Sequence, residues 1–211
     1  MKKIIFVDVP MQKKNTINYC NTGNVKSKYD KEIVYPINAW LAERVVVGDE
    51  LKIVLLETIN NDEEHDRQTK ENSELYLKEI EDAVAGKNVQ IEVVHLKSDF
   101  DESKENQELR FRKMIDVLET DCELLGDITF GPRLLSMLLF CVFNFGERFY
   151  NCRIKGMIYG KALHNINDSQ KVSNGALYDV STLYHLNNLT NSIQVDTAKD
   201  ALRAFDEFFS L

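Results

Sequence analysis

Short apolar runs alternate along the chain with longer segments in which apolar residues recur at helical spacing. The runs are rich in Val, Ile and Leu, which is typical of strands that are buried on both faces of a parallel sheet. Glycine, proline or a polar loop separates most of them from the helical segments. The predicted strands cover residues 3–9, 51–57, 89–96, 124–129, 154–159 and, as a short last strand, 176–179.

The remaining apolar residues follow a helical pattern. In the first such segment, Ile33, Ile37, Trp40 and Leu41 fall on one face, and a face of this kind packs against a sheet. Strands and helices that alternate along a chain indicate parallel β-α-β units. We therefore expect an α/β fold, doubly wound and Rossmann-like, in which a mostly parallel sheet carries helices on both faces. The predicted helices cover residues 32–43, 62–85, 105–119, 132–145, 182–193 and 196–209.

The length of the chain bounds its domain organisation. With 211 residues, the chain is long enough for one α/β domain and short for two. We expect residues 1–194 to form the ligand-binding domain and residues 195–211 to form a C-terminal helix, a candidate connection to an effector. The helix at residues 132–145 is apolar nearly all round, which indicates burial by the core or partly by a partner.

Charge narrows the classes of partner. A net charge of −8 argues against binding to long nucleic acid, which needs a basic face. Residues 10–31 nevertheless hold five lysines against one acid, Asp30. A local basic loop on an acidic body is able to receive a small anion; the alternative is an ordinary solvated loop.

The cysteines and the apolar content indicate the compartment. The four cysteines lie far apart without a C-x-x-C pair, so we expect a reducing cytoplasm, no disulfides and no metal or other cofactor. The longest apolar stretch, residues 134–145, is shorter than the roughly 20 residues of a membrane span. We therefore expect no membrane segment.

The candidate site follows from the topology. In an open parallel sheet, ligands bind outside the carboxyl ends of the strands, where the strand order reverses. With the common order, the first and fourth strands are neighbours there, so residues 8–19 and 127–133 should converge. Residues 11–29 form a long polar segment, and loops of this length are usually functional. The chain carries neither G-x-G-x-x-G nor G-x-x-x-x-G-K-[ST] here, which removes the main support for a nicotinamide cofactor or a P-loop.

Residues 127–133, Asp-Ile-Thr-Phe-Gly-Pro-Arg, combine groups that suit an anion. Gly131 lets the backbone approach a ligand closely, and the helix that begins at Pro132 aims free N–H groups at the same place. Arg133 adds a planar fork suited to phosphate or to the face of a purine.

Three further side chains of this segment have two interpretations. Thr129 offers a hydroxyl to a ligand, and Phe130 is able to stack on a base. Alternatively, Asp127 and Thr129 only cap the helix that follows.

This segment and two later ones resemble the CARF (CRISPR-associated Rossmann fold) family. Residues 127–133 resemble the D-x-T-H-G-x-R signature of one branch, with Phe130 in place of the histidine. Residues 158–163, Ile-Tyr-Gly-Lys-Ala-Leu, are similar to a tyrosine- and glycine-containing turn of that branch. Residues 178–183, Tyr-Asp-Val-Ser-Thr-Leu, resemble its aspartate-leucine-threonine segment.

The resemblance implies a specific function. CARF domains pair as two-fold dimers and bind a cyclic oligoadenylate, the second messenger of type III CRISPR antiviral systems, across the dimer axis. This chain would then be a homodimeric sensor of cyclic tetra-adenylate that controls a fused or associated effector. The implied ligand-binding residues are Pro10, Met11, Gln12, Asn18, Asp127, Thr129, Phe130, Gly131, Arg133 and Lys161, of which Lys161 is expected to follow the fifth strand.

Two other functions stay open. Some CARF proteins cleave the ring without metal by attack of a 2′-hydroxyl on its adjacent phosphate, so the chain is alternatively a ring nuclease. Thr129, Arg133 and Lys161 would then orient the attack. The third function is a regulator that binds another nucleotide. A histidine general base is not expected, because the four histidines lie outside the predicted site, at His65, His95, His164 and His185.

Overall fold

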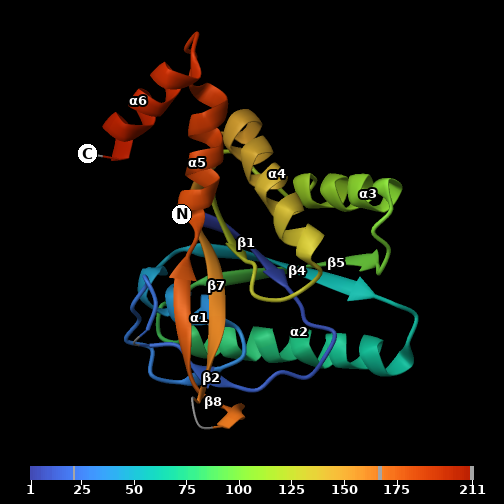
Figure 1. The fold of residues 1–211 in the computed structure, drawn as a ribbon. Coiled ribbons are helices and arrows are strands. Elements are labelled where there is room, and N and C mark those ends of the chain that lie inside the picture. Colours follow the sequence, from blue (N-terminus) through green and yellow to red (C-terminus); the bar gives the residue numbers. More distant parts are fainter. Residues whose placement is uncertain (21, 166–167, 210–211) are drawn as a thin grey trace.

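One six-stranded sheet organises the chain, with the strand order β5-β4-β1-β6-β7-β8 (Figure 1). Neighbouring strands are parallel except β7 and β8, which form an antiparallel pair at one edge. The computed structural model describes residues 1–20, 22–165 and 168–209. The strands of this sheet are β1 (Lys2–Asp8), β4 (Glu50–Ile59), β5 (Gln90–Asp99), β6 (Glu123–Asp127), β7 (Arg153–Asn165) and β8 (Asp168–Asp179).

Helices cover both faces of this sheet (Figure 1). Ile5 and Val7 of β1 belong to the apolar core under α1 and α2, whereas Ile4 and Phe6 belong to the core under α3 and α4. Two apolar layers, one on each side of the sheet, confirm the predicted doubly wound α/β fold. The helices are α1 (Pro36–Arg44), α2 (Glu63–Ala83), α3 (Lys104–Ile115), α4 (Arg133–Tyr150), α5 (Ser181–Ser192) and α6 (Ala198–Phe209).

The strand order reverses between β1 and β6. From β1 the chain builds outward through β4 to β5, and it then returns to the other side of β1 with β6. Val7 is paired with Asp127 in the parallel register, so the loops that follow the two strands leave the same edge of the sheet. The predicted neighbourhood of the first and fourth strands is therefore confirmed, and it creates the crevice in which such folds bind ligands.

The antiparallel pair β7 and β8, at one end of the sheet, differs from the prediction. β7 continues to Asn165 instead of ending near residue 159, and β8 begins at Asp168 instead of near residue 176. Lys161 is paired with Ala176 inside this hairpin. The added residues are mostly polar in sequence, and antiparallel pairing of β7 with β8 holds them in the sheet. The pattern of apolar residues therefore did not reveal this extension.

The first helix is shorter than predicted. It begins at Pro36, because proline fits the first helical position and holds the residue before it in an extended conformation. The residues Glu32–Ile33 instead form β3, which pairs with β2 (Ile17–Asn18) in a small separate sheet.

The C-terminal helix α6 forms as predicted and projects away from the sheet (Figure 1). None of its residues is buried, and the side chains of Leu202, Phe208 and Phe209 are all more than half exposed. The division of the chain at residue 194 and the connection of this helix to an effector stay predictions.

Gly160 supplies a test of the packing between β7 and α1. A Cβ atom at this position would lie 2.4 Å from Cγ of Pro36 and 3.1 Å from Cε1 of Tyr19, and both rings are buried. We expect Gly160→Ala to lower the free energy of unfolding by about 1–3 kcal/mol, as overpacked sites do, in urea denaturation. Lys161→Ala, at the exposed position next to it, should change that free energy by less than roughly 0.5 kcal/mol. Equal losses in both variants would contradict the packing explanation.

Candidate functional site

A cavity of about 480 Å³ lies at the reversal of the strand order. Its wall comes from the loop after β1, the turn between β6 and α4, the start of α2 and the loop after β5. The lining residues are Pro10, Met11, Gln12, Lys14, His65, Phe100, Thr129, Phe130, Gly131, Pro132 and Arg133.

The structure brings most of the predicted ligand-binding residues together. Two segments that are more than a hundred positions apart in the sequence meet here because β1 and β6 are neighbours. The role of these residues in binding stays a prediction. Those that line the cavity are Pro10, Met11, Gln12, Thr129, Phe130, Gly131 and Arg133.

Three predicted residues lie outside the cavity wall. Asn18 is in β2, where its Nδ2 donates to Oδ1 of Asp30 (2.5 Å) and its Oδ1 accepts from the Cys20 N–H (2.9 Å). Lys161 was expected to follow the fifth strand, and this is wrong: it is an exposed residue inside β7. The pairing of β7 with β8 continues the strand past the point where a loop was predicted. Asp127 is buried beneath the cavity.

Asp127 anchors the turn between β6 and α4. Its Oδ1 accepts from the Thr129 N–H (2.9 Å), and its Oδ2 accepts from the Ile37 N–H (3.3 Å) in the first turn of α1. Thr129 in turn accepts from the Gly160 N–H of β7 through Oγ1 (2.9 Å). These side chains therefore tie the turn to α1 and β7.

The alternative in which Asp127 and Thr129 cap the next helix is wrong. The N-cap residue of α4 is Pro132, and this helix start has no side-chain cap. The first N–H groups of a helix have no partner within the helix. At α4 the Leu135 N–H donates to the carbonyl oxygen of Pro132 (3.0 Å), so the N–H groups of Arg133 and Leu134 are the ones that offer donors to an anion in the cavity.

A second carboxyl group, that of Asp8, lies directly under the turn. Asp8 is 2% exposed, and neither of its carboxyl oxygens has a hydrogen-bond partner among the residues that the structure describes. Gly131 has φ +82°, and a Cβ atom there would lie 3.0 Å from Oδ2 of Asp8. Only glycine adopts this conformation without strain, so Gly131 lets the turn rest on the buried carboxyl.

Burial shifts the protonation of both carboxyl groups. Burial, and secondarily the charge of Asp127, raises the pKa of Asp8 well above its ordinary value, while Arg110 offsets this in part. Burial raises the pKa of Asp127 to about 6, although the N–H groups of Thr129 and Ile37 oppose the rise. Asp8 therefore favours its neutral form, so the floor of the cavity repels an anion less than two carboxylates would.

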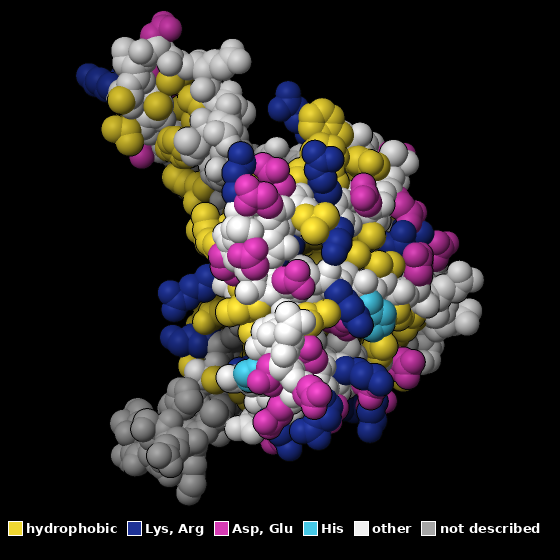
Figure 2. All heavy atoms as spheres, turned by 90° about the vertical axis from the view of Figure 1, so that its right-hand side faces the viewer, with side chains coloured by type: hydrophobic (Ala, Val, Ile, Leu, Met, Phe, Trp, Pro, Cys, Tyr) yellow, Lys and Arg dark blue, Asp and Glu magenta, His cyan; other side chains and the backbone are white. Residues whose placement is uncertain are grey.

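The charged groups on the wall favour an anion. Lys14 and Arg133 line the cavity together with His65, and all three present donors. Figure 2 views the molecule from the edge at which β4 and β5 end, and it shows basic side chains interspersed with acidic ones on this face. Because acidic side chains interrupt the basic ones on this face, it suits a long polyanion poorly, whereas Lys14 and Arg133 in the cavity suit a small anion.

A buried amide holds the loop after β1. Asn72 of α2 is 3% exposed, and its Nδ2 donates to the carbonyl oxygens of Pro10 (2.6 Å) and Gln12 (3.1 Å). This part of the polar loop is thus fixed by the core rather than only by its own residues.

Sequence reasoning missed two lining residues. His65 lies at the start of α2, so the expectation that all four histidines lie away from the site is wrong. Its Nδ1 is 2.8 Å from Nδ2 of Asn60. Phe100 follows β5 directly. Each residue comes after a parallel strand, and all such loops leave the same edge of the sheet, which is the signal that could have found them.

Phe130 is held from two sides. Its ring packs edge-to-face on that of Tyr35, with centroids 5.7 Å apart, and Nζ of Lys14 lies 5.9 Å from its centroid. An adjoining cavity of about 340 Å³ shares Lys14, Thr129 and Phe130 and extends to Tyr159 of β7. The two cavities together give an anion site with space for a larger ligand.

Within residues 1–20, 22–165 and 168–209, no group of three or more His, Cys, Asp or Glu side chains is placed to hold a metal ion. In the same described part of the chain, no helix has the length and apolar character that crossing a membrane requires.

Comparison with known proteins adds no assignment: no family model matches the chain, and no curated protein matches it.

The buried carboxyl groups predict a pH dependence of stability. Asp8 and Asp127 both have a higher pKa in the folded chain than the 3.8 of an ordinary aspartate. At a pH between 3.8 and the folded pKa of each group, the folded state holds more protons than the unfolded state. The contribution of the two carboxyl groups to stability is therefore full at acid pH and is lost as the pH rises. For Asp127, with a folded pKa of about 6, the loss amounts to about 3 kcal/mol.

Asp8→Asn isolates this effect, because the change keeps the shape and removes the ionisable group. We expect the melting temperature of the variant, relative to the unchanged protein, to rise as the pH rises above 3.8, the ordinary pKa of an aspartate. Circular dichroism melts at several pH values measure it. Asp116→Asn, at an exposed position, is the control. A difference for Asp8→Asn that does not change with pH would show that this carboxyl is not titrating as argued.

Proposed function

We propose that this chain is a cytoplasmic sensor that binds a cyclic oligoadenylate, cyclic tetra-adenylate in the first place, across a homodimer in type III CRISPR antiviral signalling. The observation that carries the proposal is the cationic cavity formed where residues 10–14 meet residues 129–133. The D-x-T-x-G-x-R pattern lies in the second of these segments. The resemblance to CARF domains places their ligand at the same loops.

The phosphates of the ring have suitable partners. Arg133 presents a planar fork that matches two phosphate oxygens, and Lys14 is a mobile point charge on the same wall. The uncapped start of α4 adds backbone N–H groups and the positive end of the helix dipole. The proposed ligand therefore meets three kinds of donor in one cavity.

A second copy of the chain would complete the site. Two-fold symmetry doubles Arg133 and Lys14 against a ligand that is itself symmetric. Leu134 and Met137, in the first turns of α4 beside the cavity, are 41% and 66% exposed. Exposed apolar residues that cluster beside a site mark an interaction surface, which fits a homodimer that meets near α4.

Effector control and partners follow the same proposal. The ring switches a fused or associated effector, and α6 with its exposed apolar residues is the candidate connection. Long nucleic acid is not a partner in this scheme, since the chain is acidic overall, with a net charge of −8, and long nucleic acid needs a basic face.

One observation favours a second function, that of a ring nuclease. His65 lines the cavity, and because its Nδ1 accepts from Nδ2 of Asn60 (2.8 Å), its Nε2–H would donate to a phosphate oxygen of the ring. The ribose 2′-oxygen would bond to the adjacent phosphorus and lose its proton to water, and the 5′-oxygen would leave and take up a proton from water, giving a 2′,3′-cyclic phosphate. Lys14 and Arg133 would stabilise the charge that develops on the phosphate oxygens.

Calorimetric titration with cyclic tetra-adenylate tests the sensor. We expect about one ring per two chains, as a site on a two-fold axis requires. Arg133→Ala should weaken binding roughly 10-fold or more, since it removes charge-assisted hydrogen bonds. Arg148→Ala, at the other end of the same helix, should bind as the unchanged chain does. No heat with cyclic tetra- or hexa-adenylate would reject the sensor and leave a regulator of another nucleotide.

Recovery of the ligand after long incubation tests the nuclease. In a metal-free buffer, chromatography should show linear or halved products only if the ring is cleaved. His65→Ala should then slow cleavage by a factor on the order of 100 or more, as loss of one donor to the developing charge does, while binding persists. An intact ring would reject the nuclease and retain the sensor.

A further inference from the structure

Phe100 is an exposed aromatic residue on a fixed backbone. Its side chain is 54% exposed and lines the cavity, although apolar rings of this size are usually buried. Its N–H donates to the carbonyl oxygen of Ile59 at the end of β4 (2.7 Å). The backbone of Phe100 is therefore fixed to the end of the sheet, and its ring lies at the cavity wall.

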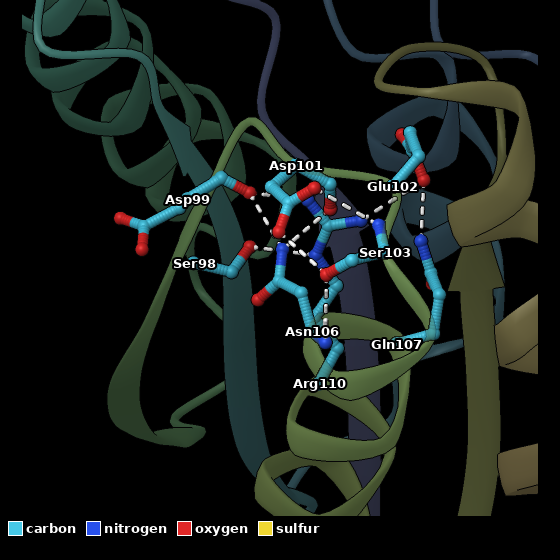
Figure 3. A network of polar contacts seen from close by, with 8 residues as sticks. All are labelled: Ser98, Asp99, Asp101, Glu102, Ser103, Asn106, Gln107 and Arg110. Carbon is cyan, nitrogen blue, oxygen red and sulfur yellow. Dashed lines mark hydrogen bonds and ion pairs between the residues drawn. The ribbon is translucent and has the colours of Figure 1, made fainter.

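A network of polar contacts fixes the loop that carries it (Figure 3). Asn106 of α3 donates through Nδ2 to the carbonyl oxygens of Asp99 (3.0 Å) and Asp101 (2.5 Å), on either side of Phe100. Arg110, one turn further along α3, donates through Nη2 to the same Asp99 carbonyl oxygen. Two side chains of one helix thus hold the backbone before and after the ring.

The network is anchored on both sides. Arg110 also donates through Nε to Oγ of Ser98 (3.1 Å). Its Nη1 lies 3.4 Å from Oε2 of Glu102. Ser103 caps α3 by accepting from the Asn106 N–H, and its own N–H donates to Oδ1 of Asp101 (2.9 Å). Figure 3 shows these side chains converging on the loop.

Burial makes this network rigid. Arg110 is 3% exposed and Asn106 is 9% exposed. A buried guanidinium or amide that lost these partners would carry a large desolvation cost, so the contacts are maintained. The loop therefore needs no ordering when a ligand binds, and a preorganised contact retains more of its binding free energy.

We infer that Phe100 is the base-stacking residue of the cavity and that Asn106 and Arg110 are its positioning residues. The inference rests on the proposed adenine-containing ligand. Phe130, the other phenylalanine on the wall, already packs on Tyr35 and lies beside Lys14. Among the described residues, Phe100 packs on no aromatic ring, and its side chain is 54% exposed. Of the two rings, that of Phe100 is therefore the more accessible to a base. Aromatic rings bind bases by stacking without needing a particular sequence.

The test compares a ligand that has a base with one that lacks it. Calorimetry with cyclic tetra-adenylate, AMP and ribose 5-phosphate would be done on the unchanged chain and on Phe100→Ala and Phe100→Trp. We expect Phe100→Ala to weaken both adenine compounds roughly 5-fold or more and Phe100→Trp to retain binding. Ribose 5-phosphate should bind all three alike. Phe149→Ala, an exposed ring at the far end of α4, is the matched control.

A double-mutant cycle tests the positioning residues. Asn106→Ala alone should weaken binding of cyclic tetra-adenylate, but it should add little in a chain that already carries Phe100→Ala, because both act through one ring. Quenching of the 2-aminopurine analogue of AMP on binding reports stacking directly, and Phe100→Ala should abolish it. Additive losses would show that Asn106 affects the site only through general stability.

The outcomes separate this inference from the proposed function. Equal affinity of Phe100→Ala and the unchanged chain for cyclic tetra-adenylate would overturn the stacking role and leave the sensor intact. Binding of AMP that depends on Phe100, without binding of any cyclic oligoadenylate, would overturn the sensor and keep the stacking role. Absence of binding by every adenine compound would overturn both.

Discussion

The site depends on one constraint, the buried carboxylate of Asp127 at the end of β6. It accepts one N–H from the turn that follows it and one from the first turn of α1, so a strand, a turn and a helix meet at a single group. A buried charge without such partners would be very costly. The two hydrogen bonds therefore fix the turn and the first turn of α1 against the end of β6. Thr129 extends the connection to β7. The position of the cavity wall follows from these bonds together with the order of the strands.

The same principle recurs around the cavity. Asn72 of α2 holds the carbonyl groups of Pro10 and Gln12, and Asn106 of α3 holds those on either side of Phe100. In each case a buried polar side chain from a helix binds the backbone of a loop that leaves the carboxyl edge of the sheet. Loops that would otherwise lose entropy on binding are thereby ordered in advance. The free groups that remain at the wall are the side chains that suit phosphate and bases.

The sequence was sufficient to predict the sheet and the place of the site. Runs of Val, Ile and Leu located the parallel strands, and the alternation with helices predicted that β1 and β6 would be neighbours, which brought Gln12 and Arg133 to one cavity. The expected place of Lys161 after the fifth strand was wrong because the polar extension of β7 leaves no apolar signal. Asn18 was misplaced because the long loop contains β2, which turns it toward Asp30. His65 and Phe100 were missed because His65 opens α2 and Phe100 follows β5, and both lie outside the two segments that the motifs marked.

The protonation of the floor explains how an acidic chain can hold an anion. The net charge is −8, and two aspartates lie directly under the cavity, yet burial favours the neutral form of Asp8. If both were fully ionised, they would oppose a phosphate at close range in a medium of low dielectric constant. Because burial raises the pKa of Asp8, the carboxyl that supports the Gly131 turn carries less negative charge beneath Arg133 and Lys14 than an ordinary aspartate would. Burial of Asp8 and Asp127 therefore has two effects at neutral pH: it lowers the free energy of unfolding, and it reduces the negative charge beneath the cavity.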